Sequence, residues 1–275
     1  QENQCLFFAA PGVPSEFQAM LAEECLPLIR RSYPKTNAIL ERITFRTKLI
    51  PEEKIFFSLC PGLWEKLEAF GSVSSLPQIL GVDIAVSLSA ASTQELSTEK
   101  EKLTALINST PLKDSVWQIG ETSLEEWVLK KAAERNKTLA AAESCTGGLI
   151  GSRLTDVPGS SKSFLGTLVT YSNQAKSDLL QVPSDTLRNF GAVSEPVALA
   201  MAAGAQRAFH ADISIATSGI AGPDGGTPEK PVGTLCLGVS TGTTTSAQTV
   251  HYQGERSFLK KRFSEYALFT LLDAL

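Results

Sequence analysis

The sequence is poor in histidine, and its few cysteines are widely spaced. Only two histidines occur in 275 residues, His210 at the end of a predicted helix and His251 inside a predicted strand. Because neither lies in a glycine-rich loop, we do not expect a Ser-His-Asp triad. The five cysteines are odd in number and lack the paired spacing of a zinc site or a disulfide framework. Such thiols are typical of a reducing cytoplasm.

Basic residues are not in excess, and long apolar runs are missing. The net charge is −4 and the pI is near 5.4, which disfavours nucleic-acid binding because a phosphate backbone needs a basic surplus. No apolar run approaches the roughly 18 residues of a membrane span. With 43% hydrophobic residues, the composition instead predicts a soluble, globular, cytoplasmic protein that acts on small molecules and has no membrane partner.

Hydrophobic periodicity divides the chain into three parts. Residues 5–10 predict a short buried strand, and residues 17–31 predict an amphipathic helix. Residues 38–110 alternate strand-like and helix-like segments, which is typical of a small α+β module. From about residue 112 onward strands and helices alternate again, and this part predicts a three-layer α/β domain.

The C-terminal part has the sharper pattern. A capping box of Ser123 and Glu126 predicts the start of its first helix. The expected strands are residues 138–144, 165–172, 212–219, 234–241 and 247–253, and the expected helices are residues 124–136, 145–157, 173–180, 194–210 and 255–274.

The segment AAESCTGGLIGSRL, residues 141–154, places a hydroxyl and a thiol at a glycine-rich bend between a strand and a helix. In α/β folds, ligands bind beyond the carboxyl ends of the strands, where helix N-termini offer free amides. Ser144 is therefore a candidate nucleophile, and the amides of Thr146, Gly147 and Gly148 are candidate oxyanion donors. The bend also fits a bound phosphate or a helix cap without chemistry, and Cys145 is an alternative nucleophile.

A serine nucleophile needs a base, and a partly buried lysine can replace histidine because burial lowers its pKa. Lys176 is the best placed lysine, five residues after Tyr171 at the exit of the predicted strand 165–172. Tyr171 would relay the proton or hold the lysine in position. The alternative interpretation is a solvent-exposed lysine and a core tyrosine.

A second glycine-rich loop, TSGIAGPDGGTPEKPVG at residues 217–233, follows another predicted strand. Its five glycines and three prolines favour a loop shaped around a ligand, yet it contains neither a Walker A pattern nor a dinucleotide fingerprint. Ser218 and Gly219 would supply a hydroxyl and an amide at the strand end. Arg256 opens the last predicted helix, where it would meet an anionic group with Lys260 one turn later.

Four ordered segments, residues 141–180, 191–205, 217–235 and 254–268, resemble the C-terminal domain of the CinA family of competence/damage-inducible proteins. The resemblance covers about residues 115–275, and we expect this domain to span residues 113–275. It implies a nicotinamide-nucleotide amidase, which hydrolyses the carboxamide of nicotinamide mononucleotide to nicotinate mononucleotide and ammonia in pyridine nucleotide salvage.

The resemblance also implies residue roles. Ser144, Tyr171 and Lys176 correspond to the catalytic group, and Ser218 and Arg256 correspond to substrate contacts. It further implies that the amidase works without a metal or other cofactor, and that the protein forms a homo-oligomer, expected to be a dimer.

The first two parts resemble the family less closely. Residues 1–35 are similar to the tail of a molybdopterin-binding-like domain, and residues 36–112 stand where long members have a KH-like connecting module. In long members the first domain resembles a metal-dependent ADP-ribose pyrophosphatase, whose catalytic residues would lie in a part that this chain lacks. Two alternatives therefore stay open: that pyrophosphatase, and a non-catalytic nucleotide-binding or regulatory protein.

Overall fold

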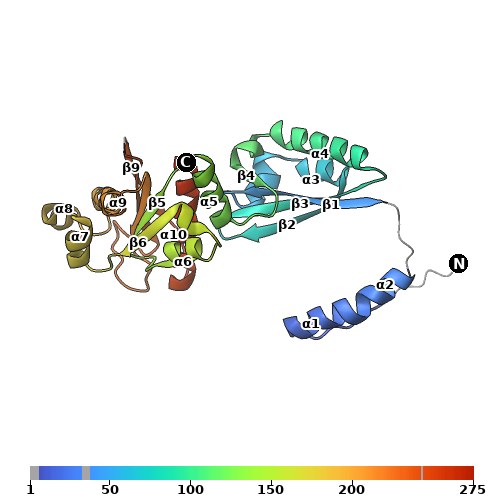
Figure 1. Cartoon of the computed structure of the whole chain (residues 1–275), viewed down its shortest axis with the longest axis horizontal. Helices are drawn as coiled ribbons and strands as arrows, with labels where there is room; N and C mark the ends of the chain where they lie inside the picture. Colours follow the sequence, from blue (N-terminus) through green and yellow to red (C-terminus); the bar gives the residue numbers. More distant parts are fainter. Residues whose placement is uncertain (1–5, 33–37, 243) are drawn as a thin grey trace.

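The computed structural model describes residues 6–32, 38–242 and 244–275 of the chain. Two separate β-sheets follow one another along the long axis of the molecule, each with its own helices and hydrophobic core (Figure 1). Among the described residues, no helix combines the length and the apolar character that crossing a membrane requires.

A helical segment precedes the first sheet. It consists of α1 (Pro14–Met20), the π-helical turn η1 (Leu21–Cys25) and α2 (Leu26–Ser32), which confirms the helix predicted at 17–31. The strand predicted at 5–10 is wrong for residues 6–10, which form no regular structure and leave Phe7 91% exposed. A strand needs a neighbour for its backbone groups, and neither sheet extends to these residues. Cys5 lies outside the described residues.

A four-stranded antiparallel sheet forms the first module, residues 39–119. Its strands are β1 (Ile39–Thr47), β2 (Gly71–Gln78), β3 (Gly81–Ala90) and β4 (Val116–Ile119), in the order β2-β3-β1-β4. Two helices, α3 (Leu63–Glu68) and α4 (Thr93–Asn108), cover one face of the sheet (Figure 1). The turns η2 (Lys54–Leu59) and η3 (Pro111–Ser115) complete the module. It has the α+β character that the sequence predicts.

Two strands of this module are not predicted from the sequence. β2 reads GSVSSLPQ, which is rich in serine and mostly exposed, so it lacks the apolar alternation of a half-buried strand. β4 is only four residues long. Because β4 pairs with β1, with Ile119 opposite Phe45, the first sheet extends beyond residue 112, the expected end of the module, as far as Ile119.

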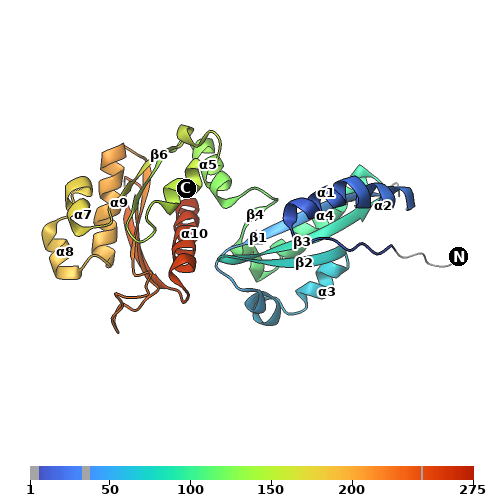
Figure 2. The ribbon, with the colours of Figure 1, turned by 90° about the horizontal axis from the view of Figure 1, so that it is seen from below.

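A three-layer α/β domain follows, residues 124–275, as predicted; we call it the C-terminal domain. Its mixed sheet has the order β6-β5-β7-β8-β9, formed by β5 (Leu139–Glu143), β6 (Phe164–Val169), β7 (Ile213–Gly219), β8 (Thr234–Ser240) and β9 (Thr245–His251). One face carries α5 (Leu124–Glu134), α6 (Leu149–Thr155) and α10 (Arg256–Ala274), and the other carries α7 (Asn173–Leu180), α8 (Ser184–Phe190) and α9 (Glu195–Phe209) (Figure 2). The short turn η4 (Ser160–Lys162) precedes β6.

Local sequence explains how these layers form. The capping box of Ser123 and Glu126 is present and starts α5. All five residues of β5, LAAAE, are buried. The small side chains of its three alanines let helices approach the sheet from both faces. Gly238 in β8 serves the same purpose, because a Cβ there would lie 2.3 Å from the carbonyl oxygen of Ala198 in α9.

The topology brings the predicted site segments to one edge of the sheet. β5 runs parallel to both β6 and β7, so the carboxyl ends of these three strands lie together. Ser144 follows β5, Thr170 follows β6, and Ser218 lies at the end of β7. This edge is where ligands bind in α/β folds.

Candidate active site

A tight turn, residues 144–148, joins β5 to α6 at this edge. The backbone amide of Ser144 donates to the carbonyl oxygen of Thr217 at 2.9 Å, which attaches the turn to β7. Gly147 and Gly148 have φ values of +64° and +93°, in the left-handed region that glycine reaches without steric cost. The glycines therefore allow the chain to bend sharply directly after Ser144, and α6 begins only at Leu149.

The carboxylate of Glu143 caps the N-terminus of α6 from inside the protein. Its side chain is fully buried. Oε2 accepts from the amides of Gly148 at 2.9 Å and Ile150 at 3.1 Å. Oε1 accepts from the amide of Gly151 at 2.9 Å and the hydroxyl of Thr167 at 3.1 Å. An internal anion thus occupies this helix end, so the bend does not offer these amides to a substrate phosphate.

Lys176 lies in the first turn of α7, with its Nζ 2.9 Å from the Oγ of Ser144. Ser172 caps this helix with its side chain and thereby sets where the lysine stands. The Nζ also donates to the carbonyl oxygens of Thr170 at 2.8 Å and Tyr171 at 3.4 Å. A neutral amine has two N–H bonds and one lone pair. In that neutral form the two carbonyls take the N–H bonds and the lone pair accepts from the hydroxyl of Ser144, whereas the charged ammonium would donate to all three oxygens.

Burial favours the neutral form of this amine and the protonated form of the neighbouring thiol. Lys176 is 1% exposed, and desolvation lowers its pKa from the ordinary lysine value. Cys145 is also buried, and desolvation raises the pKa of its thiol to about 12. The thiolate is therefore disfavoured at neutral pH, which argues against Cys145 as the alternative nucleophile.

The phenol of Tyr171 faces Arg256 and not the lysine. Tyr171 is 62% exposed, and its hydroxyl accepts from Nη2 of Arg256 at 3.0 Å, while Nη1 donates to the carbonyl of Gly222 at 2.6 Å. The expected proton relay through Tyr171 is thus not supported by the geometry, because only its main-chain carbonyl reaches Lys176. One turn after Arg256, Lys260 approaches the glycine turn: a Cβ at Gly147 would lie 3.4 Å from its Nζ.

The remaining expected contact residues line or support the same edge. Thr146 is buried, and its hydroxyl lies 2.8 Å from that of Thr217. The hydroxyl of Ser218 donates to the carbonyl of Ala192 at 2.6 Å, so towards a ligand its oxygen can only accept. At Gly219 an added Cβ would lie 2.5 Å from a main-chain oxygen of β8, which explains why this position lacks a side chain.

The expected oxyanion donors need revision. The amide of Gly147 donates to the carbonyl of Ser144 at 3.2 Å, and the amide of Gly148 is taken by the internal carboxylate. Within residues 6–32, 38–242 and 244–275, the amides of Cys145 and Thr146 donate to no acceptor on another residue, although the Cys145 amide approaches its own thiol. These two amides, directly after the nucleophile, are therefore the candidate oxyanion donors, in place of Gly147 and Gly148.

A cavity of about 200 Å³ lies at this edge. It joins the turn, the start of α7, the loop before α9 and the start of α10. Its lining residues are Ser144, Cys145, Tyr171, Lys176, Ala192, Val193, Ser218, Gly219, Ala221 and Arg256. The amine of Lys176 lies beside Ser144 in this lining and Arg256 is a cation, so the cavity suits a ligand with an uncharged acyl group at Ser144 and an anionic group towards Arg256.

Sequence reasoning missed three contributors to this site. Glu143 could have been identified from the sequence, because it directly follows the apolar run LAAA at a strand end. A carboxylate at such a buried position needs hydrogen-bond donors. Thr170 contributes only its carbonyl, and the loop of Ala192 and Val193 contributes apolar surface. Backbone groups and small apolar residues leave no chemical signature in a sequence.

Comparison with known proteins gives one consistent family. The model of the CinA C-terminal domain matches residues 121–275. Two CinA-like proteins, from Chlorobaculum tepidum and Chlorobium luteolum, are 43% and 40% identical over 270 residues. Each alignment covers 96% of this chain but only 63% and 62% of the relatives. The chain thus spans about three fifths of their length.

Solved structures of similar proteins match the C-terminal domain. The competence/damage-inducible protein CihA from Agrobacterium tumefaciens is 38% identical with a TM-score of 0.53, covering 55% of this chain and 92% of that protein. A CinA superfamily protein from Escherichia coli is 31% identical with a TM-score of 0.54, covering 59% of this chain and 97% of that protein. The fold of the C-terminal domain therefore agrees with solved members.

Proposed function

The chain belongs to the CinA family, and we propose that its C-terminal domain is an amidase that converts nicotinamide mononucleotide to nicotinate mononucleotide and ammonia. The observation that carries the proposal is the 2.9 Å contact between the buried amine of Lys176 and the hydroxyl of Ser144. A serine activated by a neutral lysine performs acyl transfer, and a carboxamide is an acyl donor whose leaving group is ammonia.

In the first half of the reaction, the Oγ of Ser144 attacks the carboxamide carbon while its proton moves to the Nζ of Lys176. The amides of Cys145 and Thr146 stabilise the negative charge that develops on the carbonyl oxygen. The lysine then gives the proton to the departing nitrogen, and the C–N bond breaks to release ammonia. This leaves a nicotinoyl ester on Ser144.

In the second half, water attacks that ester. Lys176 is neutral again after ammonia departs, so it accepts the proton of the attacking water and returns it to the Oγ of Ser144. The carboxylate product leaves with a free serine. The same amine thus serves both halves, which fits a site with a single buried base.

The cavity suggests how the nucleotide lies. Because the proton of Ser218 is committed to Ala192, Ser218 accepts from the NH₂ of the carboxamide and does not bind the phosphate. The phosphate lies at the start of α10, where Arg256 is exposed and Lys260 follows one turn later. Tyr171 holds the guanidinium of Arg256 in place at 3.0 Å.

We propose that the enzyme works in the cytoplasm. We assign no metal or other cofactor to the amidase reaction. The four described cysteines are free and buried, which suits the cytoplasm. We also propose that the protein acts as a homo-oligomer in pyridine nucleotide salvage.

The test is a time course of ammonia release from nicotinamide mononucleotide and from nicotinamide riboside, with and without EDTA. We expect release from the mononucleotide that is unaffected by EDTA, and weaker release from the riboside, which lacks the phosphate. The S144A variant is expected to lose activity. Tight binding of the mononucleotide without ammonia release would instead indicate a non-catalytic binding protein, and metal-dependent cleavage of ADP-ribose would indicate the pyrophosphatase.

A further inference from the structure

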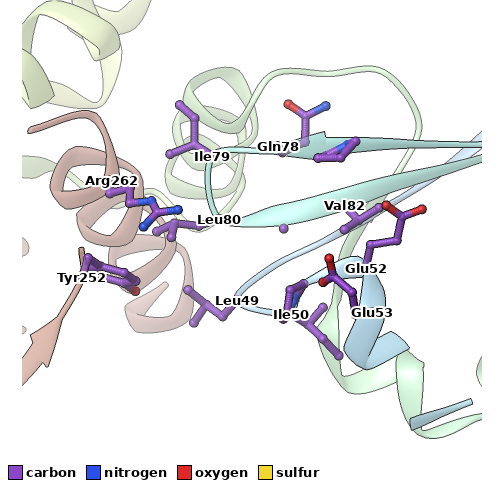
Figure 3. A pocket seen from close by; sticks show the side chains of 13 residues that line it. Leu49, Ile50, Glu52, Glu53, Gln78, Ile79, Leu80, Val82, Tyr252 and Arg262 are labelled. Atoms are coloured by element: carbon purple, nitrogen blue, oxygen red, sulfur yellow. The ribbon is translucent and has the colours of Figure 1, made fainter. Parts of the chain in front are cut away.

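A second cavity, of about 370 Å³, lies between the first module and the C-terminal domain. Its size is in the range of small-molecule sites, roughly 300–1,000 Å³. On one side are two loops of the first module, residues 49–53 and 77–82, and on the other side Tyr252 and Arg262 point towards these loops (Figure 3). The amide of Leu49 donates to the carbonyl of Leu80 at 2.6 Å, so the two loops form one connected wall.

Arg262 is held in place and lacks a counter-ion. Its Nη1 donates to the carbonyl of Gln253 at 3.0 Å, and its guanidinium lies 4.5 Å from the ring centre of Phe258 and 5.7 Å from that of Tyr252. None of the ion pairs found among the described residues involves Arg262. A fixed, uncompensated guanidinium on a cavity wall is a binding group for an anion.

The side of the cavity formed by the first module carries carboxylates, opposite the guanidinium of Arg262. Glu52 is half-buried, and one of its oxygens accepts from the hydroxyl of Ser75; Glu53 beside it is exposed. Figure 3 shows both carboxylates across the cavity from Arg262. Between these two polar ends, the lining includes the aliphatic side chains of Leu80 and Val82. A ligand therefore needs an anion at one end, hydroxyl or amino donors at the other, and an apolar body.

We propose that this cavity is a binding site for a nucleoside monophosphate. The phosphate lies on Arg262, because the planar guanidinium matches phosphate geometry. The ribose hydroxyls donate to Glu52, in the way that carboxylates bind ribose in dinucleotide folds. In a nucleotide the base and the 5′ phosphate lie on one face of the ribose and the 2′ and 3′ hydroxyls on the other, so the flat, largely apolar base packs on Leu80 and on the ring of Tyr252 beside Arg262. A free amino acid with an uncharged side chain has both charged groups on one carbon atom, so it would not reach both polar ends of the cavity.

This site is distinct from the one around Ser144. Both sites draw on α10, which carries Arg256 at its first residue and Arg262 six residues later, yet their lining residues do not overlap. AMP binding at this cavity therefore does not require the proposed amidase activity, and a binding measurement alone tests it.

The experiment is calorimetric titration of the full chain with AMP, adenosine and 2′,3′-dideoxyadenosine monophosphate. We expect saturable binding of AMP and at least about tenfold weaker binding of adenosine, since it lacks the charged partner of Arg262. The R262Q variant is expected to weaken AMP binding by a similar factor. K261Q is the matched control, because it removes a positive charge from the exposed residue next to Arg262 on the same helix, outside the linings of both cavities, and it is expected to bind AMP normally.

A second variant keeps the test independent of the folding of R262Q. E52Q is expected to bind AMP as weakly as the wild-type protein binds the dideoxy probe, and to leave binding of the dideoxy probe unchanged. The proposal is overturned if the wild-type chain shows no saturable binding of millimolar AMP, or if E52Q weakens both probes equally. It is also overturned if R256Q abolishes binding while folded R262Q does not, because AMP would then occupy the cavity at Ser144.

Discussion

Replacing Glu143 by glutamine tests whether the internal carboxylate holds the catalytic turn. Its two oxygens accept from the amides of Gly148, Ile150 and Gly151 and from the hydroxyl of Thr167. A glutamine has one acceptor oxygen, so its NH₂ must face at least one of the amide donors. A hydrogen bond to a charged group contributes about 1.5–3 kcal/mol, and the remaining bonds lose their charge assistance. We expect E143Q to lower the free energy of unfolding by about 2–4 kcal/mol.

Urea unfolding measures this change, and ammonia release measures its effect on the site. Because Glu143 directly precedes Ser144, we expect kcat to fall more than KM rises. Glu134→Gln is the matched control, since that carboxylate is exposed and, in the described part of the chain, forms an ion pair with Lys131 three residues earlier. The E134Q protein is expected to keep the wild-type unfolding midpoint. If E143Q unfolded at the wild-type midpoint and kept its kcat, the carboxylate would not be holding the turn.

Three further predictions concern the same site. The kcat/KM for ammonia release rises with pH through the lowered pKa of Lys176 and is lost below it, because only the neutral amine accepts a proton; a flat pH–rate profile contradicts this. C145A keeps kcat within about tenfold of the wild-type value, because the raised pKa leaves the wild-type thiol protonated. A folded but inactive C145A protein would indicate that Cys145 is the nucleophile. R256Q raises KM for nicotinamide mononucleotide by more than about tenfold but changes KM for the riboside little. Equal effects on both substrates would show that Arg256 does not bind the phosphate.

Much of the C-terminal domain follows from its sequence. The three layers and the five strands can be predicted because apolar runs alternate with capped helices, such as the helix that begins after Ser123 and Glu126 form a capping box. The proximity of Ser144 and Lys176 follows as well, because both stand just beyond the carboxyl ends of neighbouring parallel strands. Their order along the chain and the topology together bring them into contact.

Other features depend on contacts that no local pattern carries. The sequence marks Gly147 and Gly148 as flexible points, but not that their amides are taken by Ser144 and Glu143. It places Tyr171 near the lysine, but not the rotation that sends its phenol to Arg256. In the first module, β2 is not predicted because its serines hide the alternation of apolar and polar residues that marks a strand. Its pairing with β3 is set by tertiary structure.

The measurement that tests the central claim most directly is ammonia release from nicotinamide mononucleotide by a folded K176M variant. Methionine keeps much of the lysine side chain's length and apolar character but removes the amine that contacts Ser144. The account predicts that kcat falls by at least about 10²-fold, the usual contribution of a general base, while the mononucleotide still binds. A K176M protein that released ammonia at the wild-type rate would contradict it.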